Sequence, residues 1–189
     1  MQIERYSLPG LSLLLPQRHR DDRGYLAETF QSRRMGDAVG MAEVLQENLV
    51  WSEFAATVRG LHAQVPPNAQ AKLVTVLAGS ILDVAVDVRR GSPTFGRHLA
   101  IELTAAMGSM LYVPKGFLHG YRTLEPNTLV QYKLDAYYQP AAEIAVRFDD
   151  PDLAIDWRVP HSACHVSDKD CAAGTFADFD TPFAFDPAL

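Results

Sequence analysis

The stretch SILDVAVDV, Ser80 to Val88, is the clearest strand in this sequence. Four aliphatic side chains occupy every second position: Leu82, Val84, Val86 and Val88. The positions between them hold Ile81, Asp83, Ala85 and Asp87. Because successive side chains of a strand point to opposite faces, this spacing predicts a strand with one packed face and one face that can carry polar groups.

The segments around this strand repeat its pattern between clusters of turn residues. KLVTVLAG precedes it, HLAIELT, SMLYVP and TLVQYKLDAYY follow it, and GSPTFG and EPNT supply turns. Short strands at this spacing favour an all-β sandwich or barrel over alternating strands and helices. The helix that we expect is SRRMGDAVG, residues 32–40, which is short and interrupted by glycine. We see no repeat, low-complexity tract or linker, so the chain length suits one domain.

The charge balance restricts the kind of ligand. The 189 residues include 17 Lys and Arg against 23 Asp and Glu, which gives a formal net charge of -6. This balance argues against an extended nucleic-acid surface, which needs clustered basic side chains. We interpret the basic pairs Arg33-Arg34 and Arg89-Arg90 as solvated strand ends or turns. A small cationic pocket for one phosphorylated ligand stays compatible with this charge.

Cysteine usage and hydropathy indicate the compartment. Cys164 and Cys171 match neither a CxxC motif nor a zinc spacing, which favours a reduced protein. The first residues, MQIERYSLPG, lack the apolar region of a signal peptide, and no apolar run approaches the length of a membrane span. We therefore expect a cytoplasmic protein with no membrane partner.

A few side chains can carry out acid–base chemistry, although each has an ordinary interpretation by itself. His62 precedes Lys72 by ten residues, so adjacent strands could present both to one cavity. His119 lies in PKGFLHGY, whose glycines permit a tight bend, and would ordinarily be a loop histidine. Tyr132 would ordinarily pack in a strand, and Asp170 in SDKD would be a turn residue.

Together, these residues lie in segments that match one family in order and spacing. The segments are DDRGYLAETF, QEN, VRGLHAQ, AQAKLV, GSILDVAVDVRRGSPTFG, YVPKGFLHGY, VQYKLDAYYQP, FDDPDLAIDW and SDKD. On these segments the sequence resembles the dTDP-4-dehydrorhamnose 3,5-epimerase family of sugar-nucleotide epimerases. The resemblance implies an all-β, cupin-type jelly roll with short peripheral helices. It also implies a single domain over residues 1–189, with N-terminal and C-terminal arms, that forms a homodimer.

The resemblance also implies a reaction, inversion of C3 and C5 in a dTDP-4-keto-6-deoxy sugar. Removal of a proton beside the ketone gives an enolate, so the protein must supply a base, a stabiliser for the oxyanion and an acid on the opposite face. By resemblance, His62 is the base, Asp170 its paired carboxylate, Lys72 the cation beside the C4 oxygen and Tyr132 the acid. No cofactor and no metal are implied, because Lys72 and His62 supply the charge stabilisation.

Other matching positions are implied to bind the substrate. Arg59 matches the diphosphate contact, for which a planar guanidinium suits the forked oxygens. The remaining matches are nucleotide contacts (Gln46, Asn48), a segment that reaches the nucleotide across the dimer interface (Arg23, Glu28), pocket residues near the sugar (His119, Asp83) and an aromatic near the nucleobase (Tyr138). We interpret Asp87 as a structural or surface carboxylate.

Three departures from the family pattern leave alternatives open. Leu26 stands where an aromatic residue is common, Leu118 stands where a small residue is usual, and VWSEFAATVRG replaces a more polar run. An epimerase that inverts only one centre of a related nucleotide sugar therefore stays possible. A metal-dependent cupin fits less well, because it needs an HxH pair and GLHAQV offers one histidine. A non-catalytic sugar-nucleotide binding protein would have no use for a base, an acid and a cation together.

Overall fold

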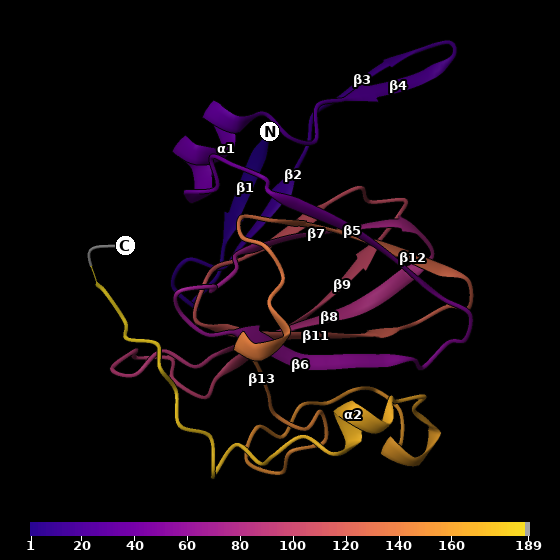
Figure 1. Ribbon diagram of the computed structural model, residues 1–189. Coiled ribbons are helices and arrows are strands. Elements are labelled where there is room, and N and C mark those ends of the chain that lie inside the picture. The colour runs from indigo at the N-terminus through magenta and orange to yellow at the C-terminus, as the bar shows by residue number, and fades with distance from the viewer. Residues whose placement is uncertain (188–189) are drawn as a thin grey trace.

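Two antiparallel sheets face each other in the computed structural model, which describes residues 1–187 (Figure 1). The six-stranded sheet contains, in spatial order, β1 (Gln2–Arg5), β2 (Ser12–Leu15), β10 (Met110–Val113), β7 (Lys72–Ala78), β12 (Thr128–Leu134) and β5 (Gln46–Ser52). The five-stranded sheet contains β13 (Glu143–Ala145), β6 (Val58–Gln64), β11 (Phe117–Thr123), β8 (Ser80–Asp87) and β9 (His98–Thr104). Because each sheet contains strands from both halves of the sequence, side chains far apart in the sequence can share the space between the sheets.

The central strand β8 confirms the alternation read from Ser80 to Val88, but both of its faces are buried. On one face, Leu82, Val84 and Val86 pack against the C-terminal part of the chain, including Trp157. On the other face, Ile81 and Ala85 pack between the two sheets. The expected polar face is therefore an interior wall, and Asp83 on it is completely buried (0% exposed).

The other predicted elements are confirmed, with small shifts at their ends. The runs at residues 72–79, 98–104 and 109–114 form β7, β9 and β10, and β12 ends at Leu134, before the aromatic run. The expected helix is α1 (Ser32–Val39), which ends at Gly40 in a left-handed conformation (φ 77°). Its buried Met35 packs on the outer face of the six-stranded sheet. The all-β class with short peripheral helices is confirmed, and no helix within residues 1–187 could cross a membrane.

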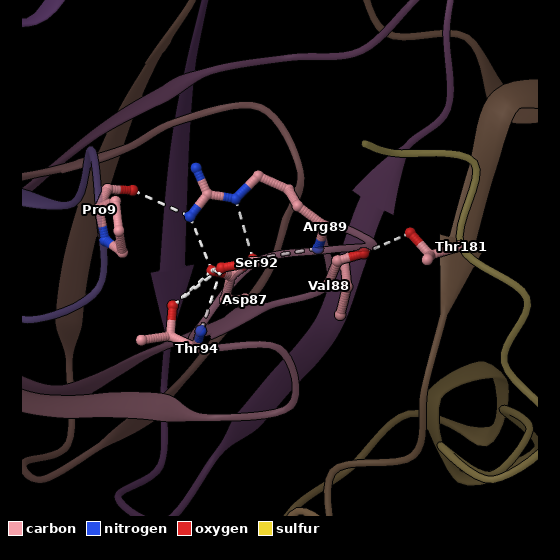
Figure 2. A network of polar contacts seen from close by, with 7 residues as sticks. All are labelled: Pro9, Asp87, Val88, Arg89, Ser92, Thr94 and Thr181. Atoms are coloured by element: carbon pink, nitrogen blue, oxygen red, sulfur yellow. Dashed lines mark hydrogen bonds and ion pairs between the residues drawn. The ribbon is translucent and has the colours of Figure 1, made fainter. Parts of the chain in front are cut away.

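Asp87 ends β8 in a buried network of polar contacts (Figure 2). Its carboxylate accepts hydrogen bonds from Arg89 Nε (2.9 Å) and Nη2 (2.7 Å). It also accepts hydrogen bonds from the hydroxyls of Ser92 (2.6 Å) and Thr94 (2.7 Å). Burial by itself would raise the pKa of Asp87, but these donors more than offset burial and lower it. Asp87 is therefore structural, as one of its two interpretations stated, and it does not lie on the surface.

The same network joins the two ends of the chain to β8. Arg89 donates to the carbonyl of Pro9 (3.0 Å), and the Thr181 hydroxyl donates to the carbonyl of Val88 (Figure 2). The Arg89 guanidinium also lies 4.5 Å from the centroid of the Phe117 ring, a cation–π distance. The interpretation of Arg89 as a solvated turn residue was therefore wrong.

The C-terminal part of the chain covers the outer face of the five-stranded sheet and carries the helix α2 (Asp168–Cys171) (Figure 1). Backbone contacts attach it on both sides of this helix. Val58 N donates to His165 O (2.9 Å) before it, and Gly174 forms a bridge to Val146 after it. The Asp150 carboxylate also accepts a hydrogen bond from Phe176 N (2.8 Å). These contacts hold α2 beside β6.

A two-stranded hairpin, β3 (Arg18–Asp21) and β4 (Gly24–Ala27), belongs to neither large sheet. Figure 1 shows it extending away from the body, beyond the side that the six-stranded sheet forms. Its strand β4 exposes Tyr25 and Leu26, the latter to 70%.

Candidate active site

His62 and Asp170 form a close pair at the edge of the five-stranded sheet. His62 Nε2, from β6, lies 2.8 Å from Asp170 Oδ1, from α2. The other carboxylate oxygen accepts a hydrogen bond from Gly60 N (3.2 Å), and the Ser167 side chain caps α2 by accepting from Asp170 N. Burial opposes ionisation of Asp170, but His62 and the Gly60 N–H lower its pKa below the usual range. The aspartate is therefore ionised at neutral pH and lies in a helix, not in the expected turn.

A second histidine–carboxylate pair lies deeper between the sheets. His119 Nε2, on β11, is 2.7 Å from Asp83 Oδ1, on the neighbouring strand β8, and both side chains are buried. The pKa of His119 is lowered chiefly by burial, against the opposing effect of Asp83. The second oxygen of Asp83, Oδ2, has no hydrogen-bond partner among residues 1–187. This pair is therefore a buried polar group at the centre of the interior wall.

His119 belongs to a strand and not to the loop that its two flanking glycines suggested. Phe117–Thr123 is continuous as β11, and His119 lies in register with His62 on β6. The glycines serve the close approach of these two strands, because a Cβ atom on Gly60 would lie 2.5 Å from the Cα atom of Gly120. The glycine of RGLH and the second glycine of GFLHGY therefore allow the two histidine-bearing strands to pack together.

Lys72 reaches the site from the opposite sheet. It begins β7 in the six-stranded sheet, whereas His62 lies in the five-stranded sheet, so the two residues are on facing strands and not on adjacent ones. Lys72 Nζ donates to the carbonyl oxygen of His62 (3.4 Å). Burial lowers the pKa of Lys72 to about 8, although Asp83 and Glu143 oppose this shift. The ammonium is therefore a cation in a poorly solvated place.

Tyr132 lies on β12, beside β7, on the same sheet as Lys72. Its ring meets the ring of His119 edge to face, with 6.1 Å between centroids. Burial raises the pKa of Tyr132 well above its ordinary value, and the neighbouring Tyr121 raises it further. The phenol is therefore protonated at neutral pH, and it faces the His119 wall from the opposite sheet.

Polar side chains of β5, β6 and the chain after β12 lie next to these groups. On β5, Gln46 Nε2 donates to Asn48 Oδ1 (3.0 Å), and Asn48 lies in register with Tyr132. The Gln46 oxygen accepts from Tyr138 N (2.8 Å). Arg59, on β6 and exposed, has its Nε 3.4 Å from the Ser52 hydroxyl at the end of β5. Gln46, Asn48, Arg59 and Tyr138 therefore extend the site along the edges of both sheets.

Arg23 and Glu28 are not brought to this site within one chain. Arg23 lies at the hairpin tip, where its guanidinium pairs with Asp21 (2.6 Å) and stays exposed. Glu28 pairs with Arg34 of α1 (2.8 Å). Arg23 therefore lies on the hairpin that extends from the body, and Glu28 lies where the chain returns from the hairpin to α1.

The structure adds Glu143 and Lys169, which our reading of the sequence missed. Glu143 begins β13, which pairs with β6 and places Ala145 opposite His62. Its carboxylate forms an ion pair with Lys169 and accepts from the Tyr138 hydroxyl (3.0 Å). Lys169 adjoins Asp170 in SDKD, a signal that could have identified it. No local pattern indicates Glu143, because its position depends on the pairing of β13 with β6.

A separate cavity of about 600 Å³ lies between α1, β10 and the C-terminal segment. Arg5, Arg89, Tyr112, Lys115 and Phe183 are among the residues that line it. None of the residues assigned a role by resemblance lines this cavity. Within residues 1–187, no group of three or more His, Cys, Asp or Glu side chains is placed to hold a metal ion.

Two facing β-sheets that hold a histidine–aspartate pair opposite a lysine and a protonated tyrosine define a jelly-roll protein equipped for acid–base chemistry. The family model described as dTDP-4-dehydrorhamnose 3,5-epimerase matches residues 5–178. The chain belongs to this family of sugar-nucleotide epimerases, which are isomerases with a cupin-like jelly-roll fold.

Individual relatives match this chain in sequence and structure over nearly its whole length. The dTDP-4-dehydrorhamnose 3,5-epimerase of Sinorhizobium fredii is 37% identical over 186 residues, which are 98% of this chain and 94% of the relative. The crystal structure of dTDP-6-deoxy-D-glucose-3,5-epimerase from Legionella pneumophila, in complex with dTDP-4-keto-L-rhamnose, has a TM-score of 0.88 and 37% identity, covering 95% of this chain and 94% of that chain. The crystal structure of ChmJ, a 3'-monoepimerase from Streptomyces bikiniensis, in complex with dTDP-quinovose has a TM-score of 0.83 and 35% identity. The match covers 91% of this chain and 86% of that chain.

Proposed function

We propose that this protein converts dTDP-4-dehydro-6-deoxyglucose to dTDP-4-dehydrorhamnose by inverting C3 and C5 through enolates. The observation that carries the proposal is the arrangement of acid–base groups on facing walls. His62 and Asp170 lie on the five-stranded side, while Lys72 and Tyr132 come from the six-stranded sheet. Epimerisation needs this separation, because a base acting alone would return the proton to the face from which it came.

In the first step, His62 removes the proton beside the ketone. The Asp170 carboxylate favours a hydrogen on Nε2, the nitrogen that it contacts, so the lone pair lies on Nδ1. The ionised carboxylate also stabilises the imidazolium that forms as His62 takes up the proton. Asp170 therefore orients the base and balances its charge.

In the second step, charge accumulates on the sugar's C4 oxygen, and Lys72 stabilises it. A fixed ammonium in a poorly solvated site stabilises an oxyanion more strongly than the same charge in water. Tyr132 then gives its proton to the enolate carbon from the opposite face, and inversion is complete. No step in this scheme requires a metal or an organic cofactor.

The remaining groups are proposed to bind the nucleotide sugar. The exposed guanidinium of Arg59 suits the diphosphate, and Gln46 and Asn48 present amides to the nucleotide. Tyr138 is proposed to contact the nucleobase, because its side chain is exposed while its hydroxyl is hydrogen-bonded to Glu143. The buried pair of His119 and Asp83 would contact the sugar, and its unpartnered Asp83 oxygen can accept a hydrogen bond there.

The protein is proposed to act as a homodimer in which Arg23 and Glu28 complete the partner's site. The face of β5 and β7 that points away from the five-stranded sheet exposes Leu49 (61%), Trp51 (55%) and Leu77 (46%). The hairpin carrying Arg23 extends beyond this same side of the molecule (Figure 1). A second copy docked on the apolar face would cover it and meet the hairpin, and a two-fold axis would make the contact reciprocal.

The proposal also covers the protein's ligand, its compartment and its domain organisation. The substrate is a nucleotide sugar, and the protein works in the cytoplasm on a dissolved substrate, without nucleic acid or membrane. We propose that the chain forms one domain with two arms, because strands from its N-terminal and C-terminal halves share each sheet. The hairpin is the N-terminal arm, and the segment that carries α2 is the C-terminal arm.

A single-centre epimerase is the second candidate, because a 3'-monoepimerase shares this fold at 35% identity. Incubation in deuterated buffer with dTDP-4-dehydro-6-deoxyglucose tests both candidates. Two deuterium atoms per molecule, with inversion at C3 and C5, are expected. One deuterium atom with one inverted centre would establish the single-centre alternative, and no incorporation would overturn the proposed function.

A further inference from the structure

Tyr121 is a buried ionisable residue to which the proposed reaction gives no role. It lies on β11, two residues after His119, and its side chain is 1% exposed within the apolar cluster between the sheets. Its hydroxyl is fully buried and has no partner in good hydrogen-bond geometry among residues 1–187, although the hydroxyls of Tyr132 and Ser52 lie near enough to affect its ionisation. The phenol therefore places one unpaired polar atom in the interior beside the candidate site.

Folding alone does not account for this hydroxyl. A buried polar group without a partner destabilises the folded state, and phenylalanine would fill nearly the same volume without that cost. The ring packs with Val130 and the other apolar side chains of its cluster, which a phenyl ring would do equally well. A partner that becomes available during the reaction would explain why a tyrosine is present.

The neighbour that can supply this partner is Tyr132. The two rings meet at 64° with centroids 6.3 Å apart. Tyr121 pairs in register with Arg59 on one side and Asp83 on the other, so its strand position lies between the two ends of the site. Each of the two tyrosines acts on the ionisation of the other, and the pKa of both is raised, chiefly by burial.

We propose that Tyr121 is a positioning residue whose hydroxyl donates a hydrogen bond to the phenol oxygen of Tyr132 during proton transfer. In this step the enolate carbon supplies an electron pair, a C–H bond forms and the O–H bond of Tyr132 breaks. The negative charge passes to the Tyr132 oxygen, where the Tyr121 O–H stabilises the phenolate. Solvent later returns a proton to Tyr132, and the proton taken by His62 passes to solvent. This inference rests on the proposed role of Tyr132 as the acid.

The first test compares Tyr121→Phe with the wild-type protein on dTDP-4-dehydro-6-deoxyglucose in deuterated buffer. The kcat for inversion should fall about 10- to 100-fold, the range expected for one hydrogen bond to a charged group. KM should change less than about threefold, and deuterium washout through His62 less than about twofold, because the base is untouched. Removing an unpaired hydroxyl should leave the melting temperature equal or higher.

Tyr112→Phe is the matched control. Tyr112 is also buried, but it lies on the outer side of the six-stranded sheet with Met35 and Leu73. Inversion and washout should keep their wild-type ratio in this variant. An equal fall of inversion and washout in Tyr121→Phe, or no fall in inversion, would overturn the assignment.

A double-mutant cycle tests whether Tyr121 acts through Tyr132. In the Tyr132→Phe background, which has no phenolate to stabilise, Tyr121→Phe should change the residual inversion rate less than about twofold. A further 10-fold loss in that background would show an independent effect and reject the proposal. If the wild-type protein inverted no centre, the proposed function would fail instead, a result separate from any effect of Tyr121.

Discussion

His62 and Asp170 lie 108 positions apart in the sequence, and their side chains meet at 2.8 Å. The same carboxylate accepts a hydrogen bond from Gly60 N, two residues before the histidine. One aspartate of the C-terminal segment therefore fixes both the backbone and the imidazole of β6. The orientation of the proposed base depends on a segment that belongs to neither sheet.

Substitutions at this pair should separate the base from its orienting group. His62→Ala is expected to abolish both deuterium exchange and inversion while leaving dTDP binding within a few-fold. Asp170→Asn keeps the shape but removes the charge, so kcat should fall by about 10²–10⁴, the span of general acid–base catalysis. Single-turnover exchange by mass spectrometry checks both results. Near wild-type exchange by His62→Ala would require another base.

Tyr132→Phe should uncouple exchange from inversion. Phenylalanine cannot supply a proton, whereas His62 can still remove one and return a deuteron to the same face. We expect deuterium to enter the substrate with retained configuration while inversion slows by at least about 10²-fold. NMR of the recovered sugar distinguishes the two products. Equal slowing of exchange and inversion would place Tyr132 in the enolisation step, and unchanged inversion would make His119 the next candidate acid.

The pH dependence should report Lys72, whose pKa burial lowers to about 8. The protonated form stabilises the enolate, so kcat should fall as the pH rises through about 8. Lys115→Met is the control, because Lys115 is half exposed and pairs with Asp135, outside the proposed machinery. The alkaline limb should persist in Lys115→Met, and activity that stays constant up to pH 10 in the wild-type protein would contradict the role of Lys72.

The lowered pKa of Lys72 also predicts that stability rises with pH over a range in which activity falls. Because the folded-state pKa of Lys72 is below its unfolded value, the unfolded chain binds more protons between about pH 8 and pH 10.5, and this lysine's contribution to stability rises across that window. Below pH 8, Lys72 costs up to about 3 kcal/mol of unfolding free energy. Lys72→Met should therefore raise the free energy of unfolding at pH 7 while lowering activity. Urea titration of both proteins at pH 7 checks this, and the difference between them should shrink as the pH rises toward 10.5.

Subunit mixing tests the shared site. Arg23→Ala and His62→Ala homodimers should each be inactive or weak, but a hybrid dimer would hold one intact site and one doubly damaged site. Mixing should therefore restore activity, up to about one quarter of wild type for random exchange of two equal pools. Native mass spectrometry must show that subunits exchange. If they exchange and no activity returns, Arg23 does not complete the partner's site.

Removal of metals should have no effect on the reaction. Lys72 and His62 supply the charge stabilisation that a metal ion would otherwise provide. Full activity is expected after exhaustive chelation and buffer exchange, with metal content followed by elemental analysis. Loss of activity that one particular divalent ion restores would contradict this prediction.

The sequence by itself determined the local structure and the family. The period-two pattern from Ser80 to Val88 predicted β8, and the helix at residues 32–39 and the turns at 91–96 and 125–128 lie where their residues indicated. Segments such as VRGLHAQ and SDKD were specific enough to indicate the family. These features depend on neighbouring residues, so they can be read along the chain.

Only the tertiary structure decided which side chains meet. Alternation predicts the two faces of a strand, but it does not predict whether each face is covered or which strand lies opposite. For this reason Asp83 was expected on a polar face and is buried against His119, and Lys72 was expected beside His62 and instead faces it across the two sheets. The pairing of β13 with β6, which places Glu143 near His62, likewise joins segments about 80 residues apart. Such contacts depend on long-range strand pairing and burial in the whole fold, which a local pattern does not contain.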